Sequence, residues 1–175
     1  SRILIETKAE HLLSALNAGT VSTNVHLRKL HNFCLDMGWL PWPILPKRQW
    51  PPVEYKEKRA ITLEEHQTIV AREPNEETRN FYELLWHLGG SQTDVAILTA
   101  ESIDWVDRVI SYQRCKTGTL SQLHFGEQAA AILARLPSHG LLFPRLAKMH
   151  QRHRGADFYR RCRGLKIKGI SLHSY

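Results

Sequence analysis

The chain has 175 residues, of which 42% are hydrophobic, so it can bury one sizeable core and a fragment of a second domain. Its net charge of +7 makes an anionic partner, nucleic acid first, the favoured hypothesis, although a soluble protein with a basic surface has the same composition. No apolar run reaches the ~20 residues that span a bilayer, and three widely separated cysteines suit neither a disulfide framework nor a zinc pair, so we expect a soluble protein in the reducing cytoplasm.

Two helices are expected at the start of the chain. The apolar residues of 8–18 fall on one helical face, and Gly19 ends that helix. A serine or threonine within 20–23 can cap a second helix, which continues until Gly38. Its apolar residues recur three and four positions apart: Val25, Leu27, Leu30, Phe33, Cys34 and Met37.

Prolines and tryptophans dominate residues 41–59. Proline cannot continue a helix and favours extended backbone, so this segment is predicted to be an interdomain linker. Its lysines and arginines could follow a phosphate backbone, and its tryptophans could stack on bases. We favour the simpler interpretation, in which the tryptophans pack the segment against a domain.

Helices are expected again from residue 60 onward. Thr62 and the glutamates that follow it predict a helix start, and this helix should end near Arg72. Residues 77–88 predict another helix, whose aromatic residues at helical spacing are most simply core. The next stretch, residues 88–104 (LGGSQTDVAILTAESID), predicts a double-glycine turn, a short buried helix and an approach to a strand.

A β-hairpin is predicted from residues 108–113 and 120–125, with a lysine in its Lys116-Thr117-Gly118 turn. Residues 126–136 then predict an alanine-rich helix, and basic residues crowd a helix or helix pair over 146–163. The sequence contains none of the glycine-rich or nucleophile motifs that would support hydride transfer, nucleotide hydrolysis or esterase chemistry.

Residues 88–104 resemble, without a gap, box I of the tyrosine recombinases (phage-integrase family), which reads T-G-x-R-x-x-E-L-x-x-L-x-W-x-D-I-D. Gly89 falls on the glycine, Asp94 on the glutamate and Leu98 on the leucine, while Ser91 holds the place of the first catalytic arginine. Family members cut DNA through a 3′-phosphotyrosine link without metal or nucleotide. The resemblance therefore implies duplex DNA as partner and no cofactor.

The resemblance also implies the fold and its division. The fold class is α+β, mainly α-helical, with a catalytic-like domain that contains a small β-hairpin or three-stranded sheet. Residues 1–40 would be the last helices of a core-binding (SAM-like) helical domain, and 41–59 the linker. Residues 60–175 would be the recombinase catalytic-like domain, incomplete at its C-terminal end.

Roles for single residues follow from the same resemblance. Lys116, in a C-K-T-G that is similar to the family's T-K-T-G, would protonate the departing 5′ oxygen. His173 corresponds to the histidine of the H-x-x-R box and would hold the phosphate, and Tyr175 lies inside that box, so it is not the nucleophile. Further DNA contacts are expected from Arg28, Lys29, Thr117, Arg152, Arg154, Arg160 and Arg161.

The chain is thus interpreted as a DNA-binding fragment of a site-specific recombinase from a mobile element, active in DNA recombination and integration, which self-associates on DNA and needs no membrane. Because the second arginine and the tyrosine nucleophile are absent from these residues, the chain itself should not cleave DNA. An arginine directly after Tyr175 and a tyrosine some tens of residues later are expected. The alternative, suggested by Ser91, is a non-enzymatic DNA-binding protein on a degenerate recombinase fold.

Overall fold

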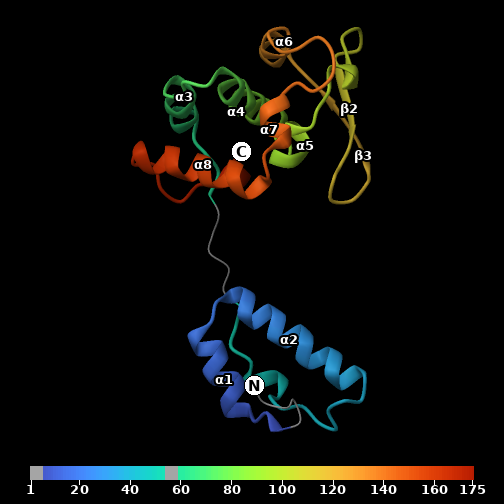
Figure 1. Ribbon diagram of the computed structural model, residues 1–175, viewed down its shortest axis with the longest axis vertical. Helices are drawn as coiled ribbons and strands as arrows, with labels where there is room; N and C mark the ends of the chain where they lie inside the picture. Colours follow the sequence, from blue (N-terminus) through green and yellow to red (C-terminus); the bar gives the residue numbers. More distant parts are fainter. Residues whose placement is uncertain (1–5, 54–58) are drawn as a thin grey trace. The chain divides into compact units, whose positions relative to one another are not determined.

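The computed structural model describes residues 6–53 and 59–175. They form two compact units, within Ser1–Glu57 and Lys58–Tyr175, and each unit has its own hydrophobic core (Figure 1). No helix within the described ranges has the length and apolar character needed to cross a membrane.

The first unit contains α1 (Ala9–Ala18), α2 (Val21–Asp36) and a short 3-10 helix, η2 (Lys47–Gln49). The two long helices match those that the sequence pattern predicts. The predicted apolar face of α2 is only partly correct, because the side that packs inside the unit carries Cys34 together with two polar residues, Asn24 and His31. Three residues of the predicted face are exposed instead: Leu30, Phe33 and Met37.

Residues 41–53, which were predicted to be linker, fold onto this helix pair. The indole of Trp50 is buried and donates a hydrogen bond to the Leu45 carbonyl at 3.0 Å. The His31 ring accepts the amide of Ile44 at 3.1 Å. Buried polar groups are stable only when they are hydrogen-bonded, so these contacts fix the path of the segment.

The tryptophans of this region differ in their packing. Trp50 packs in the core as the simpler interpretation predicts, but Trp39 and Trp42 remain 56% and 72% exposed. The rest of the predicted linker, residues 54–58, lies outside the described residues.

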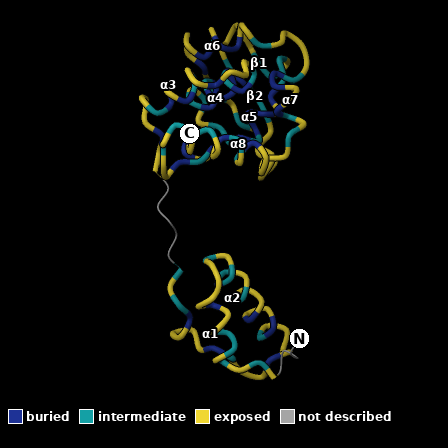
Figure 2. The backbone as a smooth tube through the Cα atoms, turned by 60° about the vertical axis from the view of Figure 1, so that its left-hand side comes forward, coloured by how far each residue is buried: buried dark blue, intermediate teal, exposed yellow. Residues whose placement is uncertain are grey.

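The second unit is built around one buried helix. That helix, α4 (Glu76–Leu88), buries Phe81, Leu84 and Leu85 at or below 1% exposure, and Figure 2 shows it in the middle of the unit. The other helices around it are α3 (Leu63–Ala71), α5 (Gln92–Ala96), α6 (Glu127–Leu133), α7 (Pro144–Lys148), α8 (Gln151–Gly164) and the 3-10 helices η3 (Ala100–Ser102) and η4 (Leu172–Ser174).

A three-stranded antiparallel sheet stands beside these helices, in the order β1-β2-β3. Its strands are β1 (Ile103–Asp104), β2 (Val109–Gln113) and β3 (Leu120–His124). Ile110 of β2 is fully buried and lies opposite Leu123 of β3, which turns one face of the sheet to the core. The predicted fold class, mainly helical with a small sheet that includes the hairpin, is confirmed.

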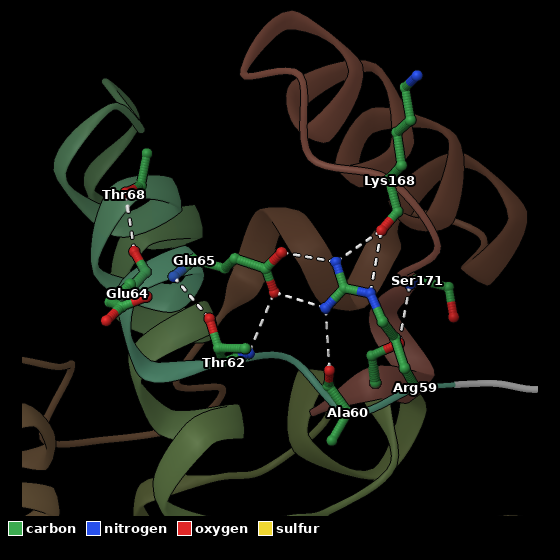
Figure 3. A network of polar contacts seen from close by, with 9 residues as sticks. Arg59, Ala60, Thr62, Glu64, Glu65, Thr68, Lys168 and Ser171 are labelled. Carbon is green, nitrogen blue, oxygen red and sulfur yellow. Dashed lines mark hydrogen bonds and ion pairs between the residues drawn. The ribbon is translucent and has the colours of Figure 1, made fainter.

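The C-terminal segment is fastened to the start of the second unit. The two terminal nitrogens of Arg59 donate to the Glu65 carboxylate at 2.7 and 2.6 Å, and Arg59 also donates to the Lys168 carbonyl (Figure 3). The Arg59 guanidinium lowers the pKa of Glu65 to about 2. The amide of Ile61 donates to the Ser174 carbonyl at 3.0 Å, so η4 is held beside the segment that leads into α3.

His66 of α3 is buried in this region. Its ring stacks on Trp86 with centroids 4.6 Å apart, and its Nδ1 lies 3.3 Å from the Tyr175 hydroxyl. Burial, with a smaller contribution from His87, lowers the pKa of His66 to about 4. The folded protein therefore holds this imidazole in its neutral form.

We expect the second unit to lose stability as pH falls from about 6.5 towards 4. The unfolded His66 takes up a proton near its ordinary pKa, whereas the folded one resists it, and the difference is on the order of 3 kcal/mol. Urea unfolding at pH 7 and pH 4.5 should show the wild-type advantage over His66→Asn shrinking at the lower pH. The exposed His124→Gln is the control, and an advantage of equal size at both pH values would contradict the assignment.

Candidate functional site

Two glycines form the turn between α4 and α5, and both are needed there. Gly89 has φ of +57°, a conformation that is strained for other residues, and its amide closes α4 on the Leu85 carbonyl at 2.9 Å. A Cβ on Gly90 would lie 2.8 Å from a methyl of Val95. Ser91 follows as the N-cap of α5, where its hydroxyl accepts the amide of Asp94 at 3.2 Å.

Asp94 is a buried carboxylate, 3% exposed, that joins α5 to the hairpin turn. Its Oδ1 accepts the amide of Cys115 at 2.9 Å, and its Oδ2 lies 3.9 Å from Nε of Arg114. A buried carboxylate is costly unless it has such partners, so this contact fixes the hairpin against α5, beside which it lies in Figure 1.

The turn after β2 has a defined shape. The Arg114 carbonyl accepts the amide of Gly118 at 2.8 Å, and Gly118 has φ of +67°. Lys116 and Thr117 lie at the exposed tip. Lys116 directly follows Cys115, which Asp94 binds, and Ser91 lies one helical turn before Asp94. Asp94 therefore connects the two positions, because its amide donates to Ser91 and its carboxylate binds the residue before Lys116.

His173 is not part of that contact. It lies in η4 with an exposed side chain, and its amide donates to the Ser171 hydroxyl at 3.3 Å. Within residues 6–53 and 59–175, no hydrogen bond or ion pair links the His173 ring to Ser91 or Lys116. The joint role of Ser91, Lys116 and His173 at one phosphate stays a prediction.

A hollow of about 490 Å³ lies beside the C-terminal segment. Leu172, next to His173, lines it together with Arg154, and Arg154 also reaches the hydroxyl of Thr93 at 3.5 Å. Thr93 lies two residues after Ser91. Arg154 therefore links the hollow to α5, although no residue of α5 is among those that line it.

Tyr175 points inward. Its hydroxyl lies against His66, its ring stacks on Tyr82 at 6.2 Å, and burial raises its pKa above the ordinary value. A buried phenol with a raised pKa is a poor nucleophile, because attack requires loss of the proton.

Arg154, one of the predicted DNA contacts, lies inside the unit. Arg154 is 5% exposed, and its guanidinium donates to the carbonyls of Leu146 and Met149, so it joins α7 to α8 inside the unit. Burial lowers its pKa, and its Nε has no hydrogen-bond partner within the described chain. Its position in a basic run indicated surface, but helical periodicity turns this one residue to the core.

Two neighbouring arginines of α8 are engaged in ion pairs. Arg160 pairs with Asp157, and Arg161 pairs with Glu73 at 2.9 Å. These carboxylates offset the positive charge that the sequence alone assigns to DNA contact. Arg160 is nevertheless exposed, whereas Arg161 is half-buried.

Arg28 of α2 has a role inside the first unit. Its guanidinium carbon lies 5.3 Å from the centre of the Trp50 ring, and its Nη2 donates to the Pro51 carbonyl at 3.2 Å. Three other predicted contacts are exposed: Lys29, Thr117 and Arg152.

Asp94 and Arg114 are two residues of this region that were not predicted as site residues. Asp94 holds the acidic position of the box I pattern, which was a usable signal. Arg114 lies two residues before Lys116, and nothing in the local pattern distinguishes it from other hairpin cations. Its pairing with a residue about twenty positions away becomes visible only in the fold.

No protein-family model and no curated protein matches the sequence of the chain. Solved structures do match its fold. Lambda integrase (residues 75–356), solved as a dimer bound to a COC′ core site, is 14% identical, with a TM-score of 0.76 over 99% of this chain and 70% of that one. The Tn1549 transposon integrase, solved with circular intermediate DNA, is 13% identical, with a TM-score of 0.69 over 99% of this chain and 71% of that one.

The integrase of mycobacterium phage Brujita is 15% identical, with a TM-score of 0.59 over 97% of this chain. The chain spans 62% of the length of that integrase. At these identities the likeness establishes the fold, and the resemblance that residues 88–104 carry is confirmed at that level.

We expect Asp94→Ala to destabilise the second unit by about 2 kcal/mol, because the Cys115 amide loses a charged acceptor. Thermal unfolding measures the change. Asp107→Ala, which removes an exposed carboxylate from the β1–β2 turn, is the matched control and should unfold like wild type. Equal stability of the two variants would show that the Asp94 contact contributes nothing.

Proposed function

We propose, from the integrase fold of this chain, that it binds duplex DNA as a recombinase-like protein. The observation that carries the proposal is the contact of Asp94 with the Cys115 amide, which holds an exposed lysine at the start of α5. Two integrases of similar fold were solved in complex with DNA, and the chain has a net charge of +7. Both support a polyanionic partner.

The proposed contact is made to the sugar-phosphate backbone. Lys116 offers a charged donor, and Thr117 offers a hydroxyl at the same exposed tip. Ser91 adds a hydroxyl that already accepts the Asp94 amide and can still donate its own proton. Contacts of this kind position DNA without reading its sequence, and they release counterions from the duplex.

The proposal extends to strand exchange in the intact integrase, with self-association on DNA. There Lys116 would protonate the 5′ oxygen as the bridging bond to phosphorus breaks, and His173 would hold a non-bridging oxygen. Ser91 brings no charge to that phosphate. Losing one such donor costs about 3 kcal/mol, or a rate factor on the order of a hundred to a thousand. We therefore propose that these 175 residues bind DNA without cutting it.

A second candidate function is DNA binding with no catalytic role even in the intact protein. Ser91 favours it, because a hydroxyl in place of a guanidinium weakens catalysis far more than it weakens binding. Both candidates require the same backbone contact, and they differ in whether a covalent adduct with DNA ever forms.

Binding should weaken steeply with salt. Fluorescence anisotropy of a labelled 30-base-pair duplex, measured from 50 to 300 mM KCl, should give a linear fall of log K with log[KCl], and Lys116→Gln should reduce the slope by about one. Arg108→Gln is the control, since Glu127 already pairs with that guanidinium at 2.5 Å. An affinity independent of salt would refute the contact with the DNA backbone, and no binding at 50 mM KCl would refute DNA binding itself.

A duplex with a nick that prevents religation should trap no covalent adduct with this chain. The reaction is followed on denaturing gels under conditions in which anisotropy shows binding. A protein–DNA band that survives denaturation would establish cleavage chemistry and would contradict the proposal that these residues only bind.

A further inference from the structure

Arg114 lies at the end of the hairpin strand β2, in a fixed backbone position. Its amide donates to the Thr119 carbonyl at 2.9 Å, and its own carbonyl accepts the Gly118 amide at 2.8 Å. The next residue, Cys115, donates its amide to Asp94. The backbone that carries the Arg114 side chain is therefore fixed by hydrogen bonds to Thr119 and Gly118.

The Arg114 guanidinium lies near a carboxylate and is largely unused. Its Nε lies 3.9 Å from Oδ2 of the buried Asp94, and the side chain is 54% exposed. Within the described part of the chain, no other hydrogen bond or ion pair involves this guanidinium. The two terminal nitrogens are thus free to donate, and this pair of donors matches two oxygens of a phosphate.

Three other arginines of the second unit are placed differently. Their terminal nitrogens lie 2.9 Å or less from carboxylates, which offset their charge; these residues are Arg108, Arg135 and Arg161. At Arg114 the only carboxylate contact within residues 6–53 and 59–175 is the longer one made by Nε. The hairpin turn therefore presents two cations, Arg114 and Lys116, on either side of the residue that Asp94 binds.

We propose that Arg114 binds the same backbone phosphate as Lys116 and provides the positive charge that Ser91 does not. This inference rests on the proposed function. Ser91 caps α5 and Asp94 lies one turn later, so a guanidinium beside Asp94 lies near the start of α5, where Ser91 brings no charge. Asp94 then has two roles, because it anchors the turn by one oxygen and orients Arg114 by the other.

The test is a double-mutant cycle on the full chain with the labelled 30-base-pair duplex. Arg114→Gln should weaken binding about tenfold at 100 mM KCl and should lower the salt slope by about one. Arg135→Gln removes an equally exposed arginine, 54%, that Glu83 pairs at 2.9 Å, and it should change neither quantity. Arg114→Lys should keep the slope and lose part of the affinity, since lysine cannot donate two parallel hydrogen bonds.

Ser91→Arg completes the cycle. If the two positions serve one phosphate, this substitution should restore most of the affinity of Arg114→Gln and add less to wild type. Thermal unfolding of each variant checks that it folds, and Arg114→Lys carries the test should Ser91→Arg fail to fold.

The outcomes separate the two proposals. Wild-type binding with Arg114→Gln indistinguishable from Arg135→Gln overturns the role of Arg114 and leaves the DNA-binding function standing. Equal gains from Ser91→Arg in both backgrounds overturn the shared phosphate. Absence of wild-type binding overturns the proposed function and, with it, this inference.

Discussion

A single buried carboxylate determines how the candidate site is put together. Asp94 is 3% exposed, and the amide of Cys115 donates to it at 2.9 Å from a turn about twenty residues later in the chain. Charge taken out of water must find donors, and here the donor belongs to the hairpin. The position of Lys116 relative to Ser91 is therefore a consequence of satisfying one oxygen atom.

The elements on either side of Asp94 support this contact. The double-glycine turn joins α4 to α5, since Gly89 takes a left-handed conformation and Gly90 leaves room for Val95. The hairpin has its own restraint, because Ile110 buries one face of the sheet against the core. Neither α5 nor the hairpin alone would place a lysine near the start of α5. The hydrogen bond from the Cys115 amide to Asp94 joins the two elements.

Local patterns predicted much of this fold. The capping residues at Thr62, the double glycine and the alternating apolar residues of the hairpin each indicate one element, and all of these elements are present. Contacts between residues far apart in the chain were harder to predict from the sequence. The sequence did not indicate that Arg154 faces the core, that Trp39 and Trp42 stay exposed while Trp50 packs, or that Arg114 meets Asp94. Each of these depends on which surfaces meet in the fold. A basic or proline-rich run has the same sequence pattern whether it is buried or exposed.

The most direct test of this account is hydrogen exchange at the Cys115 amide, measured by NMR on the isolated chain at pH 7. If Asp94 holds the turn, this amide should be protected to the same extent as that of Tyr112 within the sheet, while the amide of Lys116 next to it exchanges rapidly. Exchange of Cys115 as fast as that of Lys116 would show that the hairpin is not fastened to α5, and the common site would have no structural basis.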